Sequence, residues 1–225
     1  MKGRVFDDEA PVVIVCNNVE VIQPFLEAAG AGRELDRKLL RGDRALFWLG
    51  GPKLVIVSSP IPHLDYLRTK PGYAHVSVAY PEHPSAFLSS DILREPDLVG
   101  RIISYARPAN TIKLVPYAAT PQFLRLAERL RDEHGLQVLL PETPQRENAW
   151  VRDYIDSKAG FRALAGLWLP NARELLLEGF VARSPAEAAE MVRWFTDARR
   201  ACIVKASLGE SGLGHTVFPP DTPDS

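Results

Sequence analysis

Cysteine is scarce in this 225-residue chain, since it occurs only at Cys16 and Cys202. The two residues lie in separate apolar runs and no CxxC pair exists, which excludes a zinc ribbon and a thioredoxin-type motif. Both are therefore expected to be reduced cysteines of the core. The chain is long enough to build that core without a disulfide or a structural metal.

Long apolar runs and an excess of one charge are missing as well. No run approaches the roughly 20 residues of a membrane span, and residues 1–10 carry charges of both signs, unlike a signal peptide. Lys and Arg number 27 against 28 Asp and Glu, so the net charge is −1 and gives no overall basic field for nucleic acid or an anionic membrane. We therefore expect a cytoplasmic protein with neither nucleic acid nor a membrane as partner.

What is present is a series of short buried-strand patterns. Residues 11–16 and 53–58 are β-branched apolar runs typical of strands that are buried on both faces. Residues 75–79 predict a third strand, and residues 19–40 are mostly helical in pattern. Residues 97–106 place their apolar side chains on one helical face.

The clearest unit spans residues 111–140. Residues 111–117 predict a strand, and Thr120 is placed to cap a helix that has Pro121 at its first position and Gly135 after its end. Residues 136–140 predict a further strand. Strand, amphipathic helix and strand together predict a parallel βαβ unit, and several such units give an α/β domain.

The segment 141–147 is polar and carries two prolines, so we predict a domain boundary there. The domains are then residues 1–145, residues 146–218 and a disordered tail at 219–225. In the second domain the patterns predict a helix capped by Asp156 that ends at Gly166, and a strand over 174–181. A helix follows that begins with Ser184, Pro185 and Glu187. Strands over 201–206 and 216–218 complete it.

The segment Lys205–Thr216 is the one most suggestive of chemistry. Its glycines let backbone N–H groups turn inward to form an anion-binding concavity, and Lys205 adds a positive charge beside the hydroxyls of Ser207 and Ser211. This combination suits a nucleotide phosphate. The residues fit equally a plain glycine-rich hairpin with an exposed lysine.

Three named glycine motifs fail on this segment. His215 stands where a P-loop has its lysine, and the prolines at 219 and 220 prevent the helix that a P-loop requires. Val217 replaces the third glycine of a Rossmann fingerprint, and Leu213 replaces the last glycine of a nucleophile elbow. His63, His75 and His83 have no helical i, i+4 spacing, so no metal site and no catalytic residue are predicted.

The run Ile203–Gly214 resembles the phosphate flap of ATP-grasp enzymes, in which a glycine-rich hairpin closes over the phosphates of ATP. The order of the preceding segments is similar: Ser157-Lys158 opens a helix, Leu169-Pro170 begins a strand, and residues 184–200 form the helix before the flap. The resemblance implies that two lysines contact ATP, together with the flap; the implied binding residues are Lys158, Lys205, Ser207, Gly209, Glu210, Ser211, Gly212 and Gly214.

Residues 1–145 resemble the pre-ATP-grasp domain that precedes this fold in amino-acid and peptide ligases of bacterial secondary metabolism. The matching segments are Leu88–Leu93, the βαβ unit over 111–140, and the stretch from Asn148 to Lys158. The implied fold class is α/β, with a Rossmann-like parallel sheet followed by an incomplete α+β ATP-grasp subdomain.

The sequence departs from this family after Gly214, because the adenine pocket and the magnesium ligands of an ATP-grasp enzyme come from a later subdomain. The expectation is the N-terminal portion of an ATP-dependent carboxylate–amine ligase, inactive alone and holding neither ATP nor magnesium tightly. Its expected partners are a C-terminal ATP-grasp half or a second copy, together with a small-molecule carboxylate and amine. Open strand edges would favour a dimer or larger assembly. The alternative is a non-catalytic α/β scaffold or partner-binding subunit.

Overall fold

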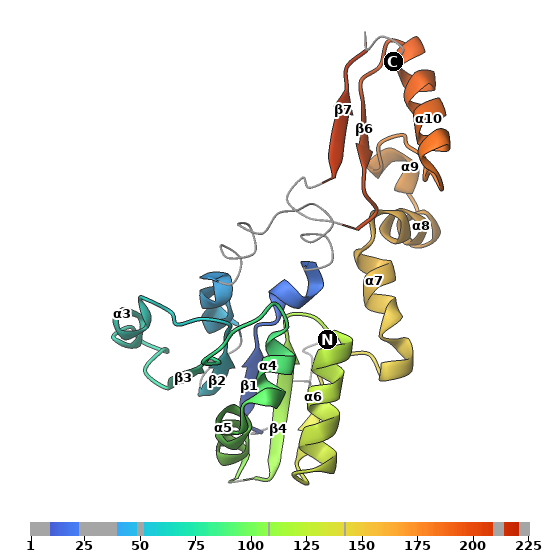
Figure 1. Cartoon of the computed structure of the whole chain (residues 1–225). Coiled ribbons are helices and arrows are strands. Elements are labelled where there is room, and N and C mark those ends of the chain that lie inside the picture. Colours follow the sequence, from blue (N-terminus) through green and yellow to red (C-terminus); the bar gives the residue numbers. More distant parts are fainter. Residues whose placement is uncertain are drawn as a thin grey trace. The chain divides into compact units, whose positions relative to one another are not determined.

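The structure of the chain is a computed structural model, and it describes residues 10–22, 40–48, 52–107, 109–141, 143–208 and 214–220. The chain divides into two compact units, Met1–Ala149 and Trp150–Ser225, which are described separately (Figure 1). Among the described residues, no helix has the length and apolar character needed to cross a bilayer.

The first unit is built on the buried runs that the sequence predicts as strands. Among the residues described there, five strands are all parallel and lie in the order β3-β2-β1-β4-β5, which is Rossmann-like. The predicted α/β fold class is thereby confirmed. The strands are β1 (Val12–Val15), β2 (Lys53–Ile56), β3 (Val76–Ala79), β4 (Thr111–Pro116) and β5 (Gln137–Leu139).

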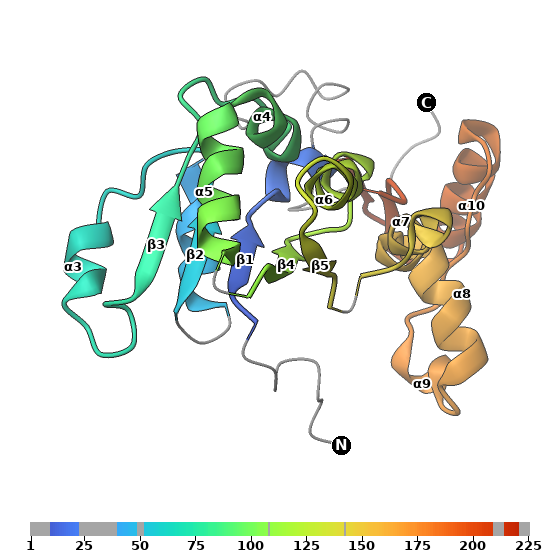
Figure 2. The same ribbon diagram turned by 90° about the horizontal axis from the view of Figure 1, so that it is seen from below.

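Three helices cover one face of this sheet (Figure 2). They are α4 (Leu88–Arg94), α5 (Pro96–Ala106) and α6 (Pro121–Asp132), and α4 packs against both of the others. Their apolar sides meet alternate residues of the strands, such as Val13 and Val15, in one core. Ile14 and Cys16 point to the opposite face, where they pack with the 3₁₀ segment η2 (Leu40–Phe47). The short helix α3 (Leu64–Arg68) lies between β2 and β3 along the chain.

The β4–α6–β5 segment confirms the predicted βαβ unit. The Thr120 hydroxyl caps α6 by accepting a hydrogen bond from the backbone N–H of Phe123 at 3.1 Å, and Pro121 occupies the first turn. Gly135 has a φ of +65°, a left-handed conformation that suits glycine after a helix. In the predicted helix over 19–40, residues 18–22 are helical, and residues 23–39 lie outside the described residues.

The 3₁₀ turn η3 (Arg146–Asn148) ends the first unit, and the second unit consists of four helices and a hairpin among its described residues. The helices are α7 (Trp150–Asp156), α8 (Lys158–Trp168), α9 (Ala172–Leu175) and α10 (Pro185–Asp197). The strands β6 (Cys202–Lys205) and β7 (His215–Phe218) pair antiparallel. Ser184 caps α10 as predicted, because its hydroxyl accepts from the N–H of Glu187 at 3.1 Å.

Two predictions for the second unit are wrong. Residues 174–181 do not form a strand: α9 runs to Leu175 and the rest has no regular structure. Leu169-Pro170 does not begin a strand either, because Leu169 caps the C-terminus of α8 and Pro170 lies in the following turn. A strand needs a neighbour for its backbone groups, and the described residues offer these segments none.

The limits of α8 also differ from the prediction. Ser157, not Asp156, caps the helix: its hydroxyl accepts from the N–H of Gly160 at 2.9 Å, whereas Asp156 is the last residue of α7. Gly166 does not end the helix, which continues to Trp168. An interior glycine costs only about 1 kcal/mol relative to alanine, so a helix can pass through it.

The described part of the predicted tail, Pro219 and Pro220, has no regular secondary structure beyond a turn at Pro220. Residues 221–225 lie outside the described residues.

Candidate functional site

The β6–β7 hairpin carries the sequence segment predicted to bind phosphate. Lys205 lies opposite His215 in the antiparallel register, and the pairing continues with a 3.1 Å hydrogen bond from the N–H of Ala206 to the carbonyl of Gly214. A strand, and no helix, follows Gly214, and it pairs with β6, so the two predicted strands are confirmed. Of the predicted site residues, Gly209, Glu210, Ser211 and Gly212 lie outside the described residues.

Gly214 lies directly before β7 in a conformation that favours glycine. Its φ is +71°, in the left-handed region. A Cβ built on it would also lie 3.1 Å from the Cβ of Ala206 on the facing strand. Both the backbone angle and the close approach therefore disfavour any larger residue at the end of the flap.

The N-terminus of α8 meets the exit of β6. The backbone N–H of Lys158 donates to the carbonyl of Ser207 at 2.8 Å, and the N–H of Ala159 reaches the Ser207 hydroxyl at 3.4 Å. The Ser157 cap takes the next N–H, that of Gly160. Two predicted site residues that are 49 positions apart in the sequence, Lys158 and Ser207, are thus brought into direct contact.

Gly160 makes this junction possible. A Cβ at this position would lie 1.8 Å from the carbonyl oxygen of Tyr154, the residue whose oxygen also accepts from the Ser157 hydroxyl at 2.8 Å. The α7–α8 corner is therefore closed around a residue without a side chain. This role of Gly160 could not be predicted from the sequence, because a glycine two positions after a lysine gives no local signal for it.

The charges at this corner are of both signs, since the exposed Asp156 ends α7 directly before Ser157 and Lys158. Lys158 occupies the first position of α8, where the helix dipole disfavours a cation. Lys205, on the neighbouring strand exit, is exposed. The Nε2 atom of His215 is buried and has no hydrogen-bond partner among the described residues. An anion placed here would be attracted by both lysines and by the dipole, and repelled by Asp156.

A second polar cluster, which the sequence analysis missed, lies at the carboxyl ends of β1 and β4, the point where ligands bind in many sheets of this strand order. The Asn17 amide donates to the Glu20 carboxylate at 3.0 Å and to the Ala118 carbonyl at 2.9 Å, and its oxygen accepts from Tyr117 N–H at 3.0 Å. The Thr120 hydroxyl donates to Glu20 as well. Asn17, Glu20 and Thr120 are all buried.

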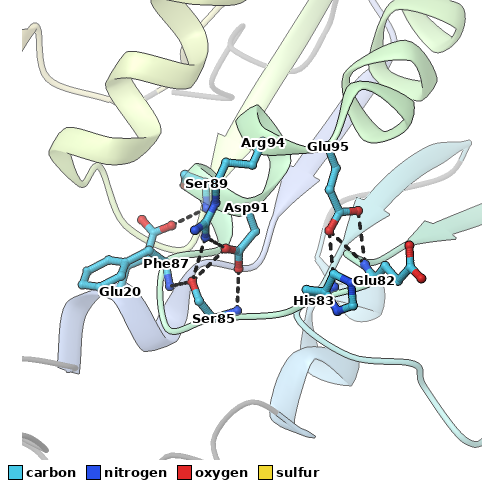
Figure 3. Close-up of polar contacts among 9 residues, drawn as sticks. All are labelled: Glu20, Glu82, His83, Ser85, Phe87, Ser89, Asp91, Arg94 and Glu95. Atoms are coloured by element: carbon cyan, nitrogen blue, oxygen red, sulfur yellow. Dashed lines mark hydrogen bonds and ion pairs between the residues drawn. The ribbon is translucent and has the colours of Figure 1, made fainter.

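This cluster places a carboxylate beside the first turn of α6, through the shared partner Thr120. A phosphate at the same helix terminus would be repelled by Glu20. The other oxygen of Glu20 accepts from the buried N–H of Ser89, which fastens α4 to the same point (Figure 3). The switch point of the sheet is therefore a structural junction of three segments and does not suit an anion.

A third polar cluster fastens the loop after β3 onto α4 and α5 (Figure 3). The buried Asp91 accepts from the N–H of Ser85 at 2.8 Å and from its hydroxyl at 2.7 Å, and Arg94 pairs with the same carboxylate. Glu95 accepts from the N–H of Glu82 at 3.0 Å. The segment 88–93, which carries the resemblance to the pre-ATP-grasp domain, thus holds buried polar groups that shape this loop.

Lys53 and Lys113 are buried on β2 and β4, one on each side of Val12 in the register. The ammonium group of Lys53 donates to the carbonyl of Trp48, and burial lowers the pKa of Lys53. Both lysines lie near the amino ends of the strands, opposite to the edge at which ligands bind in such sheets.

Within the part of the chain that the structure describes, no group of three or more His, Cys, Asp and Glu side chains is placed to hold a metal ion. A scan against protein-family models gave no match, and a search of curated proteins found no similar sequence.

Proposed function

We propose that the second unit binds the phosphates of ATP, and that the chain is the N-terminal portion of an ATP-dependent carboxylate–amine ligase of the ATP-grasp type. In this proposal the first unit is a pre-ATP-grasp domain, and the second is the part of an ATP-grasp fold that carries the phosphate flap. The observation that carries the proposal is the contact between Lys158 and Ser207, because it joins the two predicted phosphate-binding segments at one point.

The charges support a phosphate ligand more than a neutral one. Lys205 and Lys158 would neutralise phosphate oxygens, with Lys205 contributing more because its side chain is exposed at the base of the flap. The flap, including Ser207 and Gly214, would supply backbone N–H groups and a hydroxyl. The orphaned Nε2 of His215 adds a further polar atom at the same place.

In a ligase of this type ATP phosphorylates a carboxylate, and an amine then displaces the phosphate to form an amide. Charge neutralisation around the transferred phosphoryl group is the main requirement for that step. The residues of this chain would bind and orient the phosphates. We assign no catalytic residue and no magnesium ligand to the chain.

A second candidate function is a non-catalytic α/β scaffold or partner-binding subunit. It is favoured by the apolar surface of the second unit, in which only Ala165 and Ala172 are buried apolar residues among those described. In that case the β6–β7 hairpin would have a structural role, and Lys158 and Lys205 would only increase the solubility of the protein.

The two functions are separated by titrating the whole chain with ATP and magnesium in a calorimeter. We expect weak binding that Lys205→Ala abolishes and Lys158→Ala reduces to a lesser degree. Lys70→Ala is the matched control, because Lys70 is an exposed lysine of the first unit that lies over the Tyr66 ring. Binding that is indifferent to Lys205→Ala, or no binding at all, would contradict the phosphate proposal.

A further inference from the structure

The end of the α8–α9 helical hairpin presents an apolar surface, which we call the α8–α9 tip. It consists of five large side chains with the exposed fractions Leu167 77%, Trp168 71%, Leu169 43%, Leu175 69% and Leu177 89%. The six consecutive residues 166–171 are all exposed, and no charged residue occurs in the sequence from 163 to 172. The two helices that carry these residues contact one another (Figure 1).

The tip contrasts with the interior of its own unit. Ala165 and Ala172 are buried and Leu164 and Leu176 are half-buried, whereas the five side chains of the tip are exposed. A helix usually turns its large apolar side chains toward the core. The large side chains of the tip depart from this rule and remain available for a contact outside the unit.

The size of the tip fits a protein interface. A tryptophan offers up to about 250 Å², so the five side chains together expose on the order of 600 Å². That is at the upper end of what monomers expose in one patch, about 300–600 Å². With the exposed Gly166, Pro170 and Asn171 it approaches the roughly 800 Å² that each partner buries in an interface of standard size.

The charges around the tip indicate the kind of partner. Arg162 lies at its margin, because its guanidinium donates to the carbonyl of Leu177 at 2.7 Å, and the exposed Glu174 belongs to α9. A rim that carries charges of both signs can be complementary to itself in a dimer with a two-fold axis. That symmetry would place the arginine of one copy near a glutamate of the other. A membrane-binding tip would instead have a cluster of Lys and Arg around its apolar residues.

We propose that the α8–α9 tip is the interface at which a second copy of this chain binds, in a symmetric dimer with Trp168 as its central anchor. Tryptophan is the residue type that most often dominates the energy of such contacts. This interface involves none of the residues assigned to phosphate binding, so the dimer proposal can be tested independently of the proposal that the second unit binds ATP.

The test is sedimentation velocity of the whole chain over a concentration series from about 1 to 200 μM, a range that covers micromolar dissociation constants. We expect a concentration-dependent dimer, and Trp168→Ser should raise its dissociation constant at least tenfold. Leu167→Lys should act in the same direction, and it covers the case in which Trp168→Ser fails to fold. Tyr66→Ser is the matched control, since Tyr66 is 63% exposed in the first unit.

A monomer at every concentration would overturn the proposal. A dimer that both tip variants leave unchanged, while circular dichroism shows them folded, would overturn it as well, because the contact would then lie elsewhere. Co-sedimentation of a monomeric chain with phosphatidylcholine–phosphatidylglycerol vesicles, lost in Trp168→Ser, would replace the second copy by a membrane.

Discussion

Replacing Gly160 or Gly166 of α8 by alanine should change the free energy of unfolding in opposite directions. In Gly160→Ala the new methyl group would stand 1.8 Å from the carbonyl oxygen of Tyr154 and 2.8 Å from the Ser157 hydroxyl oxygen. In Gly166→Ala the methyl group meets nothing within 4 Å. Both residues lie inside α8, so each substitution gains the higher helix propensity of alanine over glycine.

The magnitudes follow from these contacts. Alanine in a helix interior is worth about 1 kcal/mol over glycine, so Gly166→Ala should raise the free energy of unfolding by about 0.5–1 kcal/mol. For Gly160→Ala the same gain is opposed by an overlap that costs about 1–3 kcal/mol and by loss of the Ser157 cap, about 1 kcal/mol. The two variants should therefore differ by about 2–4 kcal/mol.

Urea unfolding followed by tryptophan fluorescence measures this difference, because Trp150, Trp168 and Trp194 all lie in the second unit. Gly160→Ala should also weaken ATP binding, since the displaced corner carries the N–H of Lys158 that bonds to Ser207. Equal stability of the two variants would refute the reasoning, because it would show that the α7–α8 corner is not closed around Gly160.

Two further predictions concern the first unit. Thr120→Val removes the cap of α6 and one partner of the buried Glu20, so the free energy of unfolding should fall by about 2–4 kcal/mol in guanidinium titrations. The control Thr69→Val, at an exposed position, should change it by less than about 0.5 kcal/mol. Equal effects of the two variants would contradict a stabilising role of the Asn17–Glu20–Thr120 cluster. Burial raises the pKa of Cys16 to about 11, so at pH 8 about one thiol in a thousand is ionised. Iodoacetamide should then modify the less buried Cys202 first and Cys16 only on unfolding, as mass spectrometry would report; equal rates in the folded chain would oppose this.

The strands and helices that the sequence predicted correctly are those with complete local signals. The strand runs at β1 and β2 are apolar and β-branched, and α6 and α10 each combine a capping hydroxyl with a proline at the first position. These signals act within one turn or one strand. They decide the element without help from the rest of the chain.

The segments that were missed depend on partners distant in the sequence. A leucine-rich run such as 174–181 becomes a strand only beside another strand, and its own residues do not specify one. The contacts of Asn17 with residues 117–120 join positions about 100 residues apart. The same holds for the bond between Lys158 and Ser207, so the sequence could name these two residues for their chemistry but could not show that they touch.

The central strand of the sheet, β1, is also the first strand in the sequence, and this determines the order in which its neighbours become available during synthesis. β1 pairs with β2 on one side, but its other side must wait for β4, since Val15 lies opposite Pro116. At about 5–20 residues per second, a ribosome needs roughly 5–20 s to synthesise the stretch from Val15 to Pro116. During that interval the edge of β1 and the amide of Asn17 have no native partner. Long-range parallel pairing of this kind is slow to form, so the nascent chain should depend on chaperones most strongly before β4 has emerged.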